Sequence, residues 1–342
     1  MNAPYALGKL PPEHLARLFD RYPSSNRRVV LGPGIGHDAA VISFCEGDGA
    51  DGKYLVAKAD PITFATDEIG WYAVHVNAND VACTGATPRW FLATLLLPQA
   101  ETDEALVDDI FDQIARTCEE LDIALVGGHT EITHGFSRPV VGGFMLGEVP
   151  PNELVRPDGA RPGDVLMLTK GVAVEGTALI ARERGEHLHT LEPSLIQRSR
   201  DFLHDPGISV VRDAAIAVDA GDVHAMHDPT EGGLAMGLWE MAEASRVGLV
   251  VDGDAIPVFE ETRTLCRELS LDPMGLIGSG ALVVAVAPGH AADVQAALEA
   301  EGIPAAQIGV VVEREEGTVL RDGGGERPLP RFERDEITRL FE

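Results

Sequence analysis

Carboxylate-bearing short motifs recur along the chain, each at the end of an apolar run and each beside small residues. They are Gly36-His37-Asp38-Ala39, Lys58-Ala59-Asp60, Asn79-Asp80-Val81-Ala82, Gly127-Gly128-His129-Thr130-Glu131 and His227-Asp228-Pro229-Thr230. A single carboxylate is usually a surface group. Several of them at element ends, near paired glycines, are typical of the protein side of a magnesium–phosphate site. The motifs therefore indicate a candidate nucleotide enzyme.

Glycines around the first and fourth motifs could approach a phosphate closely. Gly34 and Gly36 lie in a Pro/Gly-rich loop whose backbone amides could cradle an anion, with Asp38 placed to reach a metal. Gly127 and Gly128 suit the same role after a short apolar strand. The alternative for the first segment is an ordinary loop with a turn aspartate, because a lone glycine-rich loop is a weak signal. The alternative for the fourth is a tight turn capped by Thr130.

The remaining carboxylates each have a structural alternative. Asp60 ends a predicted strand before a proline, where ligand groups gather but turns are also common. Asp80 shares one face of an otherwise apolar predicted helix with Asn77, so it needs either hydrogen bonds or a metal. Asp228 stands before a predicted helix start, where it could cap the helix or help bind a phosphate.

The composition limits the class of protein. With 27 basic and 55 acidic residues, the formal net charge is −28, and there is no basic stripe for a nucleic acid. An anionic nucleotide would be repelled unless divalent cations bridged it. We expect no membrane span, no secretory signal and a cytoplasmic protein, and the four widely spaced cysteines form no CxxC pair.

Hydrophobic periodicity predicts a mixed chain with its best boundary at the Pro/Gly-rich segment 156–164. The domains predicted are a helical extension at 1–30, a nucleotide-binding domain at 31–152 and a second domain at 153–342. Helices are expected at 12–20, 69–84, 103–121, 175–184, 195–203, 210–218, 231–245 and 291–301. Strands are expected at 39–44, 54–59, 90–97, 123–126 (short and buried), 139–149, 165–169, 224–227, 248–251, 281–287 and 307–312.

The order of the motifs resembles one superfamily. Its members include AIR synthase, thiamine-monophosphate kinase, selenophosphate synthetase and the hydrogenase-maturation protein HypE. The segments that carry the resemblance are Gly36–Val41, Asn79–Ala82 with Gly85–Pro88, Gly127–Thr130, Arg161–Asp164 and Asp228–Ala235. The last two are most similar to the hydrogenase-maturation protein.

The resemblance implies a fold of class α+β with two domains. An N-terminal AIR synthase-like domain would pair with that of a second subunit into a dimeric β-barrel, followed by a C-terminal α+β sandwich domain. It also implies ATP and Mg²⁺ as cofactors. Asp38, Asp60, Asp80 and Asp228 would be the metal ligands, and the nucleotide would contact Gly34, Gly36, Lys58, Gly127, Gly128 and Thr130.

Two departures leave the acceptor open. His37 and His129 stand where the kinase has acidic residues, and the printed chain ends at Glu342 without the maturation protein's reactive cysteine. We therefore expect an ATP- and magnesium-dependent homodimeric enzyme that activates a small molecule or a carbamoyl-type acceptor. The alternatives are a non-catalytic scaffold that binds nucleotide and a maturation partner protein, or a thiamine-monophosphate kinase.

Overall fold

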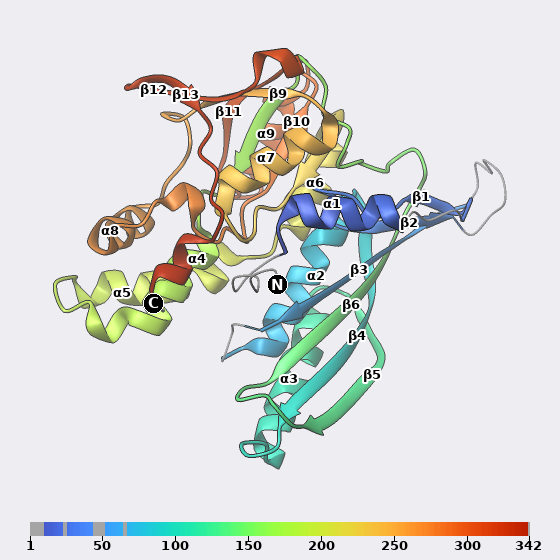
Figure 1. Ribbon diagram of the computed structural model, residues 1–342, viewed down its shortest axis with the longest axis vertical. Coiled ribbons are helices and arrows are strands. Elements are labelled where there is room, and N and C mark those ends of the chain that lie inside the picture. The colour runs from blue at the N-terminus through green and yellow to red at the C-terminus, as the bar shows by residue number, and fades with distance from the viewer. Residues whose placement is uncertain (1–9, 23–25, 44–51, 64–66, 341–342) are drawn as a thin grey trace, which may run out of the picture. The chain divides into compact units, whose positions relative to one another are not determined.

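A computed structural model describes residues 10–22, 26–43, 52–63 and 67–340 (Figure 1). The chain divides into two compact units. One comprises Ser24–Gly32 and Asp38–Leu154, and we call it the N-terminal unit. The other comprises Met1–Pro23, Pro33–His37 and Val155–Glu342, as far as these are described, and we call it the C-terminal unit. Both units mix helices with a sheet, so the expected α+β class is confirmed.

The N-terminal unit is built on a six-stranded sheet of order β1-β2-β3-β6-β4-β5. All neighbours are antiparallel except β4 and β5, which are parallel and joined by a helical crossover. The strands are β1 (Val29–Leu31), β2 (Ala40–Ser43), β3 (Tyr54–Ile62), β4 (Thr87–Pro98), β5 (Ala124–Thr133) and β6 (Val140–Val149).

Two helices, α2 (Ile69–Ala82) and α3 (Glu104–Glu120), pack together, and α2 lies against the strands β3, β4 and β6. The strand residues alternate between buried and partly exposed, as in β4, where Phe91, Leu95 and Leu97 are fully buried. Period-two alternation of this kind places one face of a sheet in the core. Asp103 caps α3 by accepting a hydrogen bond from the Leu106 amide at 2.9 Å.

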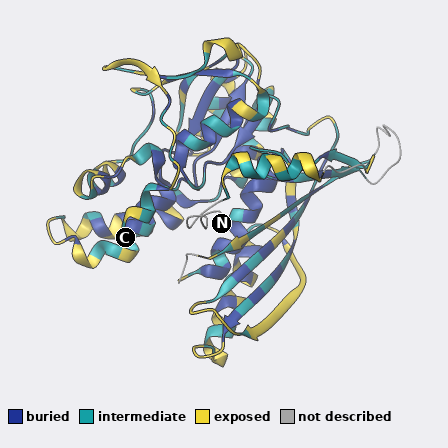
Figure 2. Cartoon of the chain, viewed as in Figure 1, coloured by how far each residue is buried: buried dark blue, intermediate teal, exposed yellow. Residues whose placement is uncertain are grey.

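Strand β5 differs from the short buried strand expected at 123–126. It continues through Gly127 and Gly128 to Thr133, and nearly all of it is exposed (Figure 2). The expectation was wrong because the apolar run Ala124–Val126 suggested a central strand, whereas β5 lies at the edge of the sheet. A bulge in the β4–β5 pairing precedes Gly127.

The C-terminal unit has a seven-stranded sheet of order β13-β12-β9-β11-β7-β10-β8, antiparallel except between β12 and β9. Its strands are β7 (Val165–Thr169), β8 (Val223–His227), β9 (Gly248–Asp252), β10 (Val283–Val286), β11 (Ala305–Val312), β12 (Thr318–Asp322) and β13 (Gly325–Pro328). The last two strands were not predicted from the sequence, because their short polar stretches carry no clear apolar alternation.

Helices contribute to the core of this unit on both faces of the sheet. Within β7, Leu166 and Leu168 belong to a cluster that includes residues of α4, α7 and α8. Met167, between them, is also fully buried but lies outside that cluster. The helices of the unit are α1 (Pro12–Arg21), α4 (Val174–Arg184), α5 (Pro193–Asp201), α6 (Val211–Ala220), α7 (Gly233–Ser245), α8 (Glu260–Leu269) and α9 (Ala291–Ala300). Helix α8 was not predicted.

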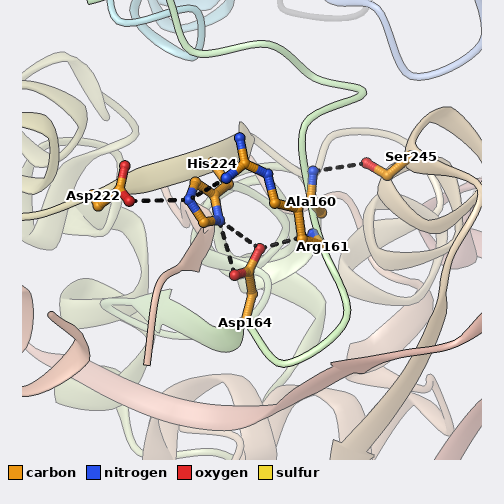
Figure 3. Close-up of polar contacts among 6 residues, drawn as sticks. All are labelled: Ala160, Arg161, Asp164, Asp222, His224 and Ser245. Atoms are coloured by element: carbon orange, nitrogen blue, oxygen red, sulfur yellow. Dashed lines mark hydrogen bonds and ion pairs between the residues drawn. The ribbon is translucent and has the colours of Figure 1, made fainter. Parts of the chain in front are cut away.

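The Arg161-Pro-Gly-Asp164 motif has a structural role at the entry to β7 (Figure 3). The Asp164 carboxylate accepts a hydrogen bond from the Arg161 amide at 2.8 Å and lies 2.8 Å from His224 Nδ1. The other ring nitrogen of His224 faces Asp222 at 3.2 Å. This cluster fixes the turn before β7 to the start of β8, which gives a structural role to a motif that the sequence indicates as part of a domain boundary and of the family resemblance.

Other expectations concern membranes and cysteines. Within the described residues, no helix combines the length and the apolar character that a membrane crossing requires. Cys83, Cys118 and Cys266 are buried and form no disulfide with another described residue, and Cys45 lies outside the described residues. Burial raises the pKa of the Cys118 thiol to about 11, so that thiol is not a ready nucleophile.

Candidate functional site

A lysine and several carboxylates meet inside the N-terminal unit. Lys58 projects from β3, and its Nζ lies 3.0 Å from Asp80 Oδ2 on α2 and 3.4 Å from Asp60 Oδ2. Asp80 is 5% exposed, whereas the Asp60 side chain is 40% exposed. The structure thus brings together three residues that the sequence predicted for the nucleotide site. We call Lys58, Asp60 and Asp80, with Asp38, the lysine–carboxylate cluster.

Helix α2 holds β3 at this point through Asn77. The Asn77 side chain accepts a hydrogen bond from the Asp60 amide at 2.9 Å and donates to the Asp60 carbonyl at 3.2 Å. A β-carbon at Gly143, on the neighbouring strand, would overlap this amide group. The buried Asn77 therefore satisfies its hydrogen bonds structurally and fixes the backbone that carries Asp60.

Electrostatics in the cluster favour cations. Burial lowers the pKa of Lys58, but the charges of Asp80, Asp60 and Asp38 outweigh burial and raise that pKa above its ordinary value. The ammonium group is consequently charged at neutral pH. Three carboxylates against one ammonium leave an excess of negative charge, and carboxylate oxygens are the ligands that Mg²⁺ prefers. The residues present therefore fit a magnesium ion.

The Asp228 motif lies in the C-terminal unit, between β8 and α7. Asp228 is 2% exposed, and the preceding His227 places Nε2 3.0 Å from Glu240 Oε2 on α7. Helix α7 begins at Gly233 rather than at residue 231, and Gly232 in the left-handed region precedes it. The residue at the N-cap position is Gly232, so neither Asp228 nor Thr230 stands at that position.

Asp335 holds this loop and was not identified from the sequence. Its carboxylate accepts hydrogen bonds from the amides of Gly232, Ile277 and Ile337 at 2.7, 3.2 and 2.8 Å. Burial raises the pKa of Asp335 to about 6, although these hydrogen bonds oppose the shift. A single aspartate in a polar tail gives no sequence signal for such a role, because its partners are 58 and 103 residues away.

The Gly34–Gly36 loop also belongs to the C-terminal unit. Gly36 has a φ of 71°, and a β-carbon there would lie 2.7 Å from the Glu240 carbonyl. The glycine is therefore required by close packing against α7. Its predicted contact with a nucleotide stays a prediction.

Gly127, Gly128 and Thr130 all lie on the exposed strand β5. Gly128 has a φ of 151°, and a β-carbon there would overlap the Ala93 carbonyl of β4. Strand packing thus explains Gly128 without a ligand. The structure does not place these three residues in the lysine–carboxylate cluster, and their predicted contacts with a nucleotide stay predictions.

Two family models match the chain. The model of the AIR synthase related protein N-terminal domain covers residues 36–149, and that of the C-terminal domain covers 161–322. Together with the relatives below, these matches show that the chain belongs to the AIR synthase related family.

Within this family the chain is similar to hydrogenase-maturation proteins. It is 32% identical to the carbamoyl dehydratase HypE of Rhizobium leguminosarum bv. viciae, over 74% of this chain and 70% of that protein. A crystal structure of the hydrogenase maturation protein HypE in complex with ATP has a TM-score of 0.71 and 26% identity, covering 94% of this chain and 93% of the other. A thiamine-monophosphate kinase from Stenotrophomonas maltophilia K279a shares the fold, with a TM-score of 0.66 and 24% identity, covering 88% and 93%.

Proposed function

We propose that this protein is an ATP- and Mg²⁺-dependent enzyme that phosphorylates or otherwise activates a carbamoyl-type acceptor. The observation that carries the proposal is the lysine–carboxylate cluster, where Asp80 is nearly buried beside a charged Lys58. A relative named carbamoyl dehydratase and a HypE structure with ATP support the acceptor class and the nucleotide.

The residues of the cluster have separate tasks in this proposal. Asp80 and Asp60 would hold Mg²⁺, with Asp38 contributing negative charge, and Asp228 of the C-terminal unit is also proposed as a ligand. The metal ion would supply charge neutralisation on the transferring phosphoryl group. Lys58 would donate hydrogen bonds to a phosphate oxygen, since its ammonium is charged and only partly covered. Asn77 would keep Asp60 in place.

A homodimer through the N-terminal sheet is part of the proposal. Trp90 and Phe144 lie on neighbouring strands and are 37% and 43% exposed, while Val126 and Ile132 on the edge strand are 51% and 58% exposed. Large apolar side chains beside an unpaired strand edge favour pairing with another chain. A second copy would cover this surface, and two such sheets would form the barrel implied by the family resemblance.

The test is nucleotide binding followed by turnover. We expect MgATP to raise the melting temperature of the wild type, and Asp80→Ala to abolish that rise, because the variant lacks the most buried carboxylate of the cluster. Asp109→Ala, an exposed position on α3, is the matched control and should keep the rise. The proposal fails if no adenine nucleotide with Mg²⁺ shifts the wild type.

Turnover separates the enzyme from a scaffold. Release of ADP that depends on a carbamoyl compound supports the enzyme. Binding of MgATP without ADP release in the presence of any acceptor supports the scaffold that keeps the nucleotide site. Formation of thiamine diphosphate from thiamine monophosphate would instead assign the kinase activity.

A further inference from the structure

Glu175 is a buried carboxyl group that the proposed nucleotide site does not use. It is the second residue of α4 and is 7% exposed. Its Oε2 atom is buried and has no hydrogen-bond partner among the described residues. An unsatisfied buried carboxyl oxygen costs free energy, so it calls for an explanation such as a ligand.

The backbone around Glu175 is tied closely to the Asp228 loop by one segment, residues 277–279. The amides of Glu175 and Gly176 donate to the carbonyls of Ser279 and Ile277 at 3.2 and 3.0 Å. The amide of Gly278 donates to the Thr230 carbonyl at 3.2 Å. The start of α4 is thereby held beside the loop that leads into α7.

Glycines allow this close approach. A β-carbon at Gly176 would lie 2.9 Å from the Ile277 carbonyl, and one at Gly233 would lie 2.6 Å from the Leu276 carbonyl. Two helix starts, those of α4 and α7, are therefore packed against the same segment of chain. An arrangement held by backbone hydrogen bonds and glycine contacts is rigid, as a binding site requires.

The charges around Glu175 limit what could bind there. Glu231, Asp335 and Asp228 are close enough to raise its pKa, and burial, the larger effect, brings that pKa to about 8. A further anion would be repelled in these surroundings. Among the described residues, Glu175 belongs to no group of three whose ligand atoms lie within 4.8 Å of one another, the spacing that a metal ion needs. A nitrogen that carries hydrogen fits both the open oxygen and the negative surroundings.

We propose that Glu175 Oε2 accepts a hydrogen bond from an N–H group of the acceptor substrate and so determines the acceptor specificity of the enzyme. This inference rests on the proposed function, because a carbamoyl group offers such an N–H₂. Ser279 hydrogen-bonds the same carboxyl group and would fix its orientation. Glu175 is thus a binding residue for the acceptor, separate from the ATP-binding residues.

The experiment compares a probe that has N–H groups with one that lacks them. Methyl N,N-dimethylcarbamate carries two methyl groups in place of the two N–H hydrogens of methyl carbamate, and guanidinium tests a cationic N–H donor. ADP release is measured against probe concentration for the wild type, Glu175→Leu and Glu175→Gln. Glu183→Gln, an exposed position on the same helix, is the matched control.

For the wild type we expect methyl carbamate, and not its dimethyl form, to stimulate ADP release. Glu175→Leu should raise the half-saturating concentration of methyl carbamate about 10- to 100-fold, because the variant loses one hydrogen bond to a carboxyl group. The half-saturating ATP concentration should change less than about twofold. Glu175→Gln should lose less than Glu175→Leu, because its amide carbonyl still accepts, and Glu183→Gln should match the wild type. A preference for guanidinium that disappears in Glu175→Gln would support a cationic acceptor at the same oxygen.

Other outcomes overturn the inference. The first is equal stimulation of ADP release by both carbamates in the wild type. The second is an unchanged half-saturating concentration of methyl carbamate in Glu175→Leu. The third is a loss of ATP affinity in that variant as large as its loss of affinity for methyl carbamate. Failure of the proposed function is distinguishable, because the wild type would then neither bind MgATP nor release ADP. In that case the change in melting temperature that methyl carbamate alone produces decides whether Glu175 binds an N–H group. A shift that Glu175→Leu abolishes supports the N–H site, and no shift in the wild type overturns it.

Discussion

Replacing Lys58 by methionine tests whether the carboxylates around it form a cation site. The variant keeps the length of the side chain but removes the ammonium that lies 3.0 Å from Asp80 and 3.4 Å from Asp60. Asp80, at 5% exposed, then lacks its main counter-charge. Without metal we therefore expect a less stable protein, and with Mg²⁺ we expect much of that stability to return.

The size of the effect follows from burial. Breaking a fully buried ion pair costs about 3–5 kcal/mol. The side chains of Lys58 and Asp80 are 18% and 7% exposed, so solvent screens the pair in part. A cost of about 2–3 kcal/mol is expected, which corresponds to a fall of roughly 5 °C or more in melting temperature. If Mg²⁺ binds the freed carboxylates, a concentration 100 times its dissociation constant would restore about 2.7 kcal/mol.

The assay is thermal unfolding in EDTA and over a Mg²⁺ titration, with Lys53→Met as the matched control. Lys53 precedes the same strand, and its Nζ lies 2.5 Å from Glu148 Oε1. Because the Lys53 side chain is 55% exposed, removing this ion pair should cost about 0–1 kcal/mol of stability. Mg²⁺ should stabilise Lys58→Met more than the wild type or the control. An equal response of all three proteins to Mg²⁺ would refute the interpretation of the cluster as a cation site.

Three further predictions concern the two units. Asp335→Asn should flatten the dependence of stability on pH between about pH 4 and pH 6. In the folded protein the pKa of Asp335 is raised to about 6, so this carboxyl group contributes its full stability below its unfolded pKa and loses that contribution as the pH rises. Urea unfolding at several pH values measures the difference. Asp213→Ala should cost about 3–5 kcal/mol in urea unfolding, because it leaves the buried ammonium of Lys170, which lies 3.3 Å from Asp213 and whose side chain is 5% exposed, without its carboxylate. Thr169→Val, which removes the hydrogen bond that the Thr169 hydroxyl donates to Asp213 and the one that it accepts from the Leu282 amide, should cost less, about 1–3 kcal/mol. Ile132→Lys should turn a dimer into a monomer in light scattering, since Ile132 is 58% exposed on the edge strand, whereas a dimer that survives both this change and Trp90→Lys would contradict the proposed interface.

The sequence identified much of the N-terminal unit, and the reasons are local. Helix α3 follows a clear period of apolar residues, so its bounds were expected within a residue. Lys58, Asp60 and Asp80 were named from motif order, and the structure brings them together. Their convergence could not be derived from spacing, because it depends on how α2 packs against β3.

The sequence could not show which groups a fold leaves unsatisfied. Glu175 lies in a helix whose other acidic residue, Glu183, is exposed, and only the fold shows that Glu175 is buried. The apolar run at 124–126 was misinterpreted for a related reason. Whether an apolar strand lies in the centre or at the edge of a sheet depends on strand order, which here is set by the crossover through α3.

Asp335 connects the end of the chain to the Asp228 loop. Its two oxygens accept from Gly232, at the start of α7, and from Ile277, beside the segment that holds Glu175. Losing these hydrogen bonds would leave two amides of that backbone unsatisfied and free the segment from the loop. Because this connection supports the surroundings of both Asp228 and Glu175, a change at Asp335 should alter acceptor use as well as stability. A change confined to the lysine–carboxylate cluster should alter MgATP binding first.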